Sequence, residues 1–189
     1  MKLKQKHVVF TVGHSTREIT EFIEILKAFN INLLVDIRTI PRSRHNPQFN
    51  KEVLPVSLKK SKIKYVHVSS LGGLRKPRGD SINMAWRNES FRGFADYMQT
   101  QQFESGLNRL IRYSQTKRPV IMCAEAVPWR CHRSLIGDAL TIRGVETLDI
   151  YSRKIARVHK LTPWARVRRK KVTYPLKKNR LKPADSGSF

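Results

Sequence analysis

The chain has 189 residues, a length typical of one domain, and its 38 Lys and Arg against 14 Asp and Glu give a net charge of +24. Hydrophobic residues make up 40% of the chain, which is enough for a core and excludes a wholly disordered protein. No apolar run approaches the ~20 residues of a membrane-spanning helix, and the first residues lack the long apolar stretch of a secretory signal. We therefore expect a cytoplasmic protein that makes no membrane contact.

The positive charge is concentrated at the end of the chain. Residues Arg153 to Phe189 contain 13 Lys and Arg and one Asp, a net charge of +12, and the rest of the chain carries the other +12. Such an excess attracts polyanions, so nucleic acid or a small anionic ligand is the expected partner; the alternative is that the charge only aids solubility. The oligomeric state is not indicated.

The first half of the chain alternates predicted strands and helices. A buried strand is predicted over residues 7–12, and a helix follows in which Ile19, Phe22, Ile23, Leu26 and Phe29 recur at helical spacing. Ser15 or Thr16 is a candidate N-cap for that helix. A second buried strand is predicted over 32–38, a polar loop over 39–50, a helix over 51–61 and a third strand over 63–68.

The second half continues the alternation after a long loop over residues 69–89. Residues 91–116 are predicted to be helical with a break near Gln101. A strand over 120–124, a helix over 131–143 and a strand over 145–150 follow. The apolar residues between 161 and 175 suggest a segment docked on the domain, and the chain beyond Lys177 has the composition of a disordered tail.

This alternation predicts the fold class. Connections too long for hairpins join successive strands, which is typical of a single layered α/β domain whose mainly parallel sheet of about five strands is flanked by helices. We expect this domain to span residues 1–175, followed by a basic tail over 176–189.

The predicted carboxyl ends of the strands are all polar. Ligands of open parallel α/β sheets bind beyond these ends, so the residues that follow each strand are the candidate site. Three of them are candidate catalytic residues: His14, Glu125 and Cys131. Seven more are candidate substrate-binding residues: Ser15, Asp36, Arg38, Arg42, Ser43, His132 and Arg133.

Cys131 has three interpretations. A helix that begins near it, together with Arg130, His132 and Arg133, favours a thiolate nucleophile. The same helix start and arginines are also suited to binding an anion, and the residue could equally be inert packing. Two cysteines are too few for a disulfide scaffold, so Cys123 and Cys131 are expected to be free thiols.

No metal or other cofactor is expected. Seven residues separate Cys123 from Cys131, a spacing that matches no common zinc ribbon or finger, and adjacent residues such as Cys131 and His132 rarely bind one ion together. The same spacing excludes a haem-attachment motif, in which two residues separate the cysteines.

The charged candidates each have a structural alternative. Glu125 is either a general acid or base, or the partner of Arg38 or Arg133 in an ion pair. Asp36 has the same ambiguity with Arg38. His14 is placed in a strand-to-helix turn, where it could act as acid, base or anion donor, or only as a cap. The loop over 39–50 has the arginines, hydroxyls and amides of a phosphate-binding segment.

Several segments resemble one known family. They are TVGHST at 11–16, LLVDIRTIPRSRHNPQFN at 33–50, YVHVSSLGGLR at 65–75, CAEAVPWRCHRSLIGDAL at 123–140, HKLTPWARV at 159–167 and TYP at 173–175. Together they resemble the family numbered 488 among the domains of unknown function, over about Val8 to Pro175. The resemblance implies an α/β layered domain whose Gly13–Ser15, Asp36–Arg38, Arg42–Ser43, Glu125 and Cys131–Arg133 clusters form one site. It does not extend to the basic residues after Pro175.

Two functions agree with these observations. The first is an enzyme acting on a nucleotide-like, nucleic-acid or other anionic substrate in a pocket at the strand ends. The second is an accessory protein that binds nucleic acid in the same basic pocket without catalysis. Cys, His and Glu at one rim favour the enzyme, because binding alone does not require those residue types.

Overall fold

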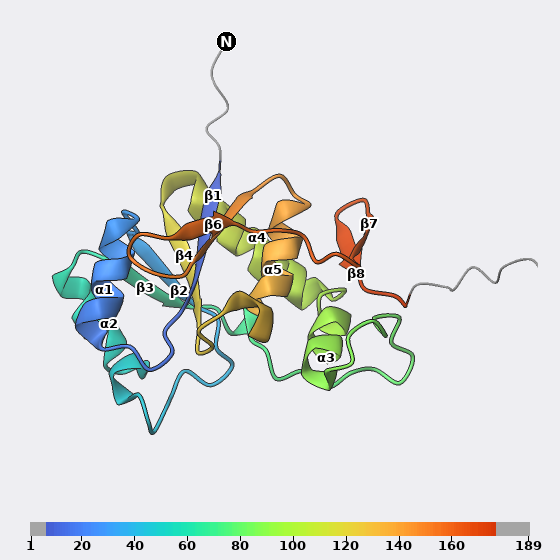
Figure 1. Ribbon diagram of the computed structural model, residues 1–189, viewed down its shortest axis with the longest axis horizontal. Coiled ribbons are helices and arrows are strands. Elements are labelled where there is room, and N and C mark those ends of the chain that lie inside the picture. The colour runs from blue at the N-terminus through green and yellow to red at the C-terminus, as the bar shows by residue number, and fades with distance from the viewer. Residues whose placement is uncertain (1–6, 177–189) are drawn as a thin grey trace, which may run out of the picture.

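A six-stranded sheet crosses the middle of the structure, a computed structural model that describes residues 7–176 (Figure 1). From one edge to the other its strands are β3 (Lys64–His67), β2 (Leu33–Asp36), β4 (Pro119–Cys123), β1 (Val8–Gly13), β5 (Glu146–Ile150) and β6 (Ala156–Val158). The first five are parallel, and β6 pairs with β5 in the antiparallel direction. The predicted α/β domain with a mainly parallel sheet is confirmed.

Helices cover both faces of this sheet and bury two apolar clusters. On one face, α1 (Ile19–Ala28) and α2 (Leu54–Lys60) pack through Phe22, Leu26 and Leu58 against side chains such as Phe10 and Leu34 of the sheet. On the other face lie α3 (Glu89–Tyr97), α4 (Gln101–Thr116) and α5 (Arg133–Thr141), whose apolar side chains include Phe94, Leu107 and Leu135. The apolar side chains of each helix therefore lie on one side of the helix and pack against one face of the sheet.

Most predicted boundaries agree with the structure, and two local predictions are wrong. The break near Gln101 is real: the Thr100 hydroxyl accepts a hydrogen bond from the Phe103 N–H and begins α4. Neither Ser15 nor Thr16 caps α1, because Ser15 occupies a left-handed turn (φ 52°) and the cap position falls at Glu18. The last helix starts at Arg133, two residues later than predicted.

Three short 3₁₀ helices and a hairpin complete the described chain. The 3₁₀ helices are η1 (Pro47–Phe49), η2 (Ser69–Leu71) and η3 (Pro128–Arg130). The hairpin joins β7 (Arg166–Arg168) to β8 (Lys171–Thr173), and the buried residues Val172 and Tyr174 attach it to the domain. The predicted basic tail, apart from Leu176, lies outside the described residues, so its boundary stays a prediction.

The order of the strands defines a switch point in the sheet. After β1 the chain passes through α1 to β2, toward one edge; after β4 it passes through α5 to β5, toward the other edge. Because β1 and β4 are neighbours, their connections diverge on opposite faces and leave a crevice beyond their carboxyl ends. Among residues 7–176, no helix is long and apolar enough to cross a membrane.

Candidate functional site

A pocket of about 640 Å³ opens at this switch point. Ten residues were predicted to form the site, and eight of them line the pocket: His14, Ser15, Arg38, Arg42, Ser43, Glu125, Cys131 and His132. The other two, Asp36 and Arg133, are buried behind its wall. The volume falls in the range of small-molecule sites.

Gly13 brings the ends of β1 and β4 together at this pocket. A Cβ at position 13 would overlap the carbonyl oxygen of Glu125. Main-chain pairing continues beyond the strands, since the N–H of His14 donates to Cys123 O at 3.0 Å and that of Ser15 to Ala124 O at 2.9 Å. The close approach places the loops after both strands on one rim.

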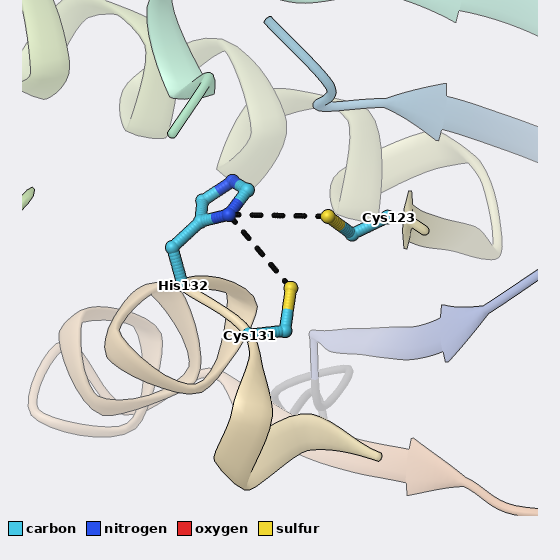
Figure 2. Close-up of side chains that lie close together, drawn as sticks. All are labelled: Cys123, Cys131 and His132. Carbon is cyan, nitrogen blue, oxygen red and sulfur yellow. Dashed lines mark hydrogen bonds between the residues drawn. The ribbon is translucent and has the colours of Figure 1, made fainter. Parts of the chain in front are cut away.

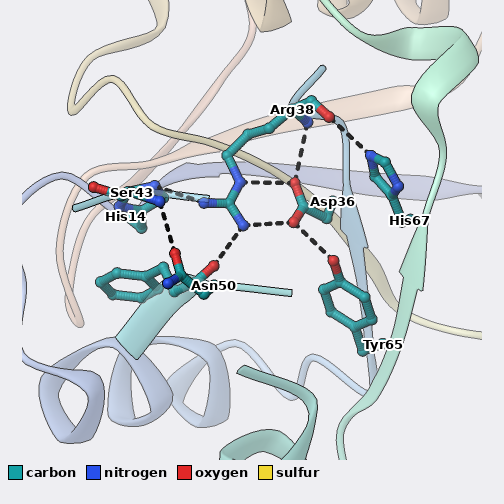
Figure 3. A network of polar contacts seen from close by, with 8 residues as sticks. His14, Asp36, Arg38, Ser43, Asn50, Tyr65 and His67 are labelled. Carbon is teal, nitrogen blue, oxygen red and sulfur yellow. Dashed lines mark hydrogen bonds and ion pairs between the residues drawn. The ribbon is translucent and has the colours of Figure 1, made fainter. Parts of the chain in front are cut away.

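Asp36 and Arg38 form a buried ion pair below the pocket (Figure 3). Arg38 Nε donates to Asp36 Oδ1 at 2.9 Å, and Nη2 donates to Oδ2 at 2.6 Å. The Tyr65 hydroxyl donates to the same carboxylate, and Nη2 of Arg38 also donates to Phe49 O. Of the two roles considered for Asp36, the structure therefore shows the ion pair with Arg38. The positive charge of Arg38 in the pocket wall is neutralised by this carboxylate.

His14 is a neutral imidazole held on both sides. Its Nδ1–H donates to Ser15 O at 2.8 Å, which leaves Nε2 as the acceptor facing Arg38 Nη1 at 3.3 Å. Its ring stacks on Phe49 with centroids 4.3 Å apart. Burial is the main cause that lowers the pKa of His14 to about 4, and the charge of Arg38 adds to it. The side chain therefore orients Arg38 and the β1–α1 loop.

Arg133 holds the loop that follows β4. Its guanidinium donates to Glu125 O at 2.6 Å and to Ala126 O at 2.9 Å. The Glu125 side chain is exposed on the pocket rim and forms no ion pair with Arg38 or Arg133. The ion pair considered from the sequence is therefore absent from the described residues, and Arg133 positions Glu125 through the main chain.

Two guanidiniums on the pocket rim are available to a ligand. Arg42 is 72% exposed and reaches only the exposed Glu52, at 3.5 Å. The Arg130 side chain is exposed and makes no hydrogen bond or ion pair with another residue of the 7–176 segment. The loop that carries Arg42 is fixed by the Ser43 N–H, which donates to Asn50 Oδ1 at 2.6 Å.

Two thiols and one imidazole meet in the lining of the pocket (Figure 2). His132 Nδ1 lies 3.9 Å from Cys123 Sγ and 3.7 Å from Cys131 Sγ. The Nε2–H of His132 donates to Leu71 O at 3.1 Å, so Nδ1 presents its lone pair to the sulfurs. Figure 2 shows the imidazole and both sulfurs pointing toward one another.

The two buried thiols differ in acidity. The hydrogen bond with Cys131 is the largest cause that raises the pKa of Cys123, and burial adds to it. Burial would also raise the pKa of Cys131, but the hydrogen bond from Cys123, the charge of Arg133 and the Arg133 N–H lower it to about 7. Within the pair, Cys131 is the thiol that ionises first.

Sequence reasoning missed three contributors to this wall. The sequence predicted Cys123 only as a free thiol that binds no metal, and Leu71 and Gly73 belong to the loop that lacked periodicity. A Cβ on Gly73 would come within 2.9 Å of the His132 ring, so the glycine lets that loop lie against the imidazole. The loop's Trp86 packs against Phe91, with ring centroids 4.8 Å apart, and does not line the pocket.

The fold and the pocket define a doubly wound α/β protein whose crevice lies at the switch point of its sheet. The chain matches the family described as Domain of unknown function DUF488 over residues 18–140, more than half of its length, and belongs to that family. This confirms the resemblance seen in the sequence, although the match is shorter than the stretch 8–175 over which the motifs were recognised. No curated protein and no solved structure matches the chain.

Proposed function

We propose that the protein is an enzyme that acts on a small anionic, nucleotide-like substrate bound in the pocket at the switch point. One observation carries this proposal: the same pocket is lined by two available arginines and by a cluster of chemically reactive side chains. A protein that only binds an anion has no need of the second group. The volume of the pocket also suits a small molecule better than a length of nucleic-acid duplex.

The substrate's anionic group is assigned to Arg42 and Arg130. Both side chains are exposed on the rim, whereas Arg38 is paired with Asp36, and Arg133 is buried and donates to the carbonyls of Glu125 and Ala126. A guanidinium binds phosphate or carboxylate through two parallel hydrogen bonds, which gives both affinity and orientation. The hydroxyl groups of Ser15 and Ser43 lie on the same lining and can supplement them.

The chemistry is assigned to the wall that carries Glu125 and Cys131. Glu125 is exposed to the pocket and free of an ion pair among the described residues, so it can accept and return a proton. Cys131 takes part through its cluster with Cys123 and His132. His14 is a positioning residue, because both ring nitrogens are occupied by internal partners.

Calorimetric titration with paired compounds tests the anion site. The probes are nucleoside monophosphates and sugar phosphates, each compared with the matching nucleoside or sugar. The phosphate compounds are expected to bind more tightly, and Arg42→Gln or Arg130→Gln should each weaken binding about 10-fold or more, the scale of a lost charge-assisted hydrogen bond. Arg44→Gln is the matched control, since Arg44 is exposed in the same loop but does not line the pocket. Equal affinity for the uncharged compounds, or an equal loss in the control, contradicts the proposal.

A second candidate function, nucleic-acid binding, is favoured by the hairpin β7–β8. Its exposed cations form no ion pair with the described carboxylates and lie away from the pocket lining: Arg166, Arg168, Arg169, Lys170 and Lys171. Each phosphate contact adds about 0.9 to the slope of log affinity against log salt. Replacing all five with Gln should reduce that slope for an oligonucleotide and leave small-anion binding unchanged. An unaltered slope excludes the hairpin as the contact.

A further inference from the structure

The cluster of Cys123, Cys131 and His132 is not explained by anion binding. The three ligand-type atoms, two Sγ and one Nδ1, all lie within 4.8 Å of one another, and all three residues line the pocket. We propose that these residues bind one Zn²⁺ ion whose fourth coordination position is open to the pocket. This proposal rests on the cluster alone and holds whether or not the arginines bind an anion.

The separations between the donor atoms fit a tetrahedral zinc ion. With Zn–S near 2.3 Å and Zn–N near 2.0–2.1 Å, a tetrahedral site separates sulfur from nitrogen by about 3.5 Å. The observed distances from His132 Nδ1 are 3.7 Å to Cys131 Sγ and 3.9 Å to Cys123 Sγ. Shifts of a few tenths of an ångström would bring each sulfur to this distance from the nitrogen.

The imidazole is already oriented as a ligand. Its Nε2–H donates to Leu71 O, which fixes the tautomer and leaves the Nδ1 lone pair directed at the sulfurs. Metal-binding histidines commonly donate their second ring N–H to a carbonyl or carboxylate in this way. Close packing of Gly73 on the ring adds a second constraint on its orientation.

The local backbone removes the objection that adjacent residues rarely share an ion. Cys131 is extended (φ −137°, ψ 143°) at the end of η3, whereas His132 is helical (φ −57°, ψ −14°) at the start of α5. The change of direction between them turns both side chains to the same side, as Figure 2 shows. Cys123 reaches this point from the end of β4, so the three ligands come from two segments that meet at the switch point.

Charge and exposure also agree with a bound dication. Both thiols are buried, at 8% and 3% exposure, and two thiolates would neutralise Zn²⁺ so that the filled cluster carries no net charge. Two thiolates, one imidazole and an open fourth position form a recognised class of catalytic zinc site. Water in that position would ionise near neutral pH, with Glu125 on the same rim to accept the proton.

Metal titration of the full-length protein tests the site without any substrate. Metal-free, reduced protein is titrated with Co²⁺ and then with Zn²⁺, and bound metal is counted by mass spectrometry. We expect one ion per chain, an absorption band from thiolate-to-cobalt charge transfer, and loss of that band when Zn²⁺ displaces Co²⁺. Zinc should also protect both thiols from a disulfide reagent.

Variants separate this proposal from the anion site. Cys123→Ser, Cys131→Ser and His132→Gln should each abolish stoichiometric binding, whereas His45→Gln, at an exposed loop histidine, should retain it. Arg42→Gln and Arg130→Gln should keep the metal while binding phosphate compounds more weakly. Because a cysteine variant can fail to fold, the wild-type cobalt spectrum is decisive: substoichiometric binding, a spectrum without thiolate charge transfer, or thiols that react equally with and without zinc would overturn the proposal and leave Cys131 as a metal-free nucleophile.

Discussion

The guanidinium of Arg38 and the carboxylate of Asp36 satisfy each other through two hydrogen bonds beneath the pocket, at 2.9 and 2.6 Å. Asp36 is completely buried and Arg38 is 6% exposed, so neither charge is available to a solvent ion. The pocket wall is therefore built on a closed ion pair, and affinity for an anion has to come from other arginines.

Removing one member of this pair should destabilise the fold strongly. Asp36→Asn leaves the buried guanidinium of Arg38 without its counter-charge, and we expect a loss of about 3–5 kcal/mol in the free energy of unfolding. Urea denaturation measures this directly. In the exposed pair Arg78–Asp80, by contrast, Asp80→Asn should leave the unfolding midpoint unchanged. Equal effects at both sites would show that the buried pair is not structural.

A side chain at position 13 should disturb both the fold and the pocket. The Cβ of Gly13→Ala would overlap Glu125 O, so the loop after β4 must move. We expect a loss of about 1–3 kcal/mol, as for overpacked sites, together with weaker binding of phosphate compounds. Gly79→Ala is the control, because a Cβ there meets no atom within 4 Å. Unchanged binding by Gly13→Ala would mean that the approach of β1 to Glu125 does not shape the site.

Glu125 should oppose anion binding while serving the chemistry. Its carboxylate is exposed on the rim that Arg42 and Arg130 share, so Glu125→Gln removes a repulsive charge. We expect phosphate compounds to bind several-fold more tightly, an energy of about 1 kcal/mol or less for exposed charges. Calorimetric titration at low salt measures the change. A 10-fold loss of affinity would instead indicate that the Glu125 carboxylate accepts a hydrogen bond from the ligand.

His159 joins the C-terminal segment to the domain through two carboxylates. Its Nδ1 lies 3.0 Å from Asp149 Oδ2 and its Nε2 lies 2.9 Å from Asp138 Oδ1. Asp138 also accepts from the Tyr174 hydroxyl at 2.8 Å, and Gly137 leaves room for the imidazole ring. Burial alone would lower the pKa of His159, but the hydrogen bonds and charges of Asp138 and Asp149 raise it to about 9.

This raised pKa predicts a pH-dependent stability. Protonated His159 stabilises the folded state fully below its ordinary pKa of 6.5, and that contribution is lost as the pH rises to about 9. Wild-type protein should lose roughly 3 kcal/mol across this window through His159, and His159→Gln should lose correspondingly less. Urea midpoints at several pH values test this, with His45→Gln as control. Parallel profiles for wild type and His159→Gln would contradict the assignment.

Periodicity predicted the elements that form the layers. Phe22 and Leu26 on α1 fit one face of a sheet, and the apolar run before Gly13 fits a strand buried on both faces. The order of strands and helices then required a mainly parallel sheet. The strand β6 was missed, because three residues such as Ala156–Val158 are too few for an apolar alternation. The hairpin of Arg166–Thr173 was also missed, because its strands are short and most of the hairpin's side chains are exposed cations that leave no apolar alternation.

The site was predicted in position better than in detail. Polar residues after each strand had to meet at one edge, and eight of the ten candidates line the pocket there. Which charges are paired depends on side-chain geometry between segments distant in sequence, so the sequence left Asp36 and Glu125 equally ambiguous. The convergence of Cys123 with His132 depends on the bend between an extended Cys131 and a helical His132, a feature that residue spacing does not reveal.

A crystal structure of the protein with its tightest-binding phosphate compound tests the central claim most directly. We predict that the phosphate lies in the pocket at the ends of β1, β2 and β4, within about 3 Å of the guanidinium nitrogens of Arg42 and Arg130. The rest of the bound compound should extend toward Glu125 and Cys131. A phosphate bound on the β7–β8 hairpin with the pocket occupied only by water would contradict the account.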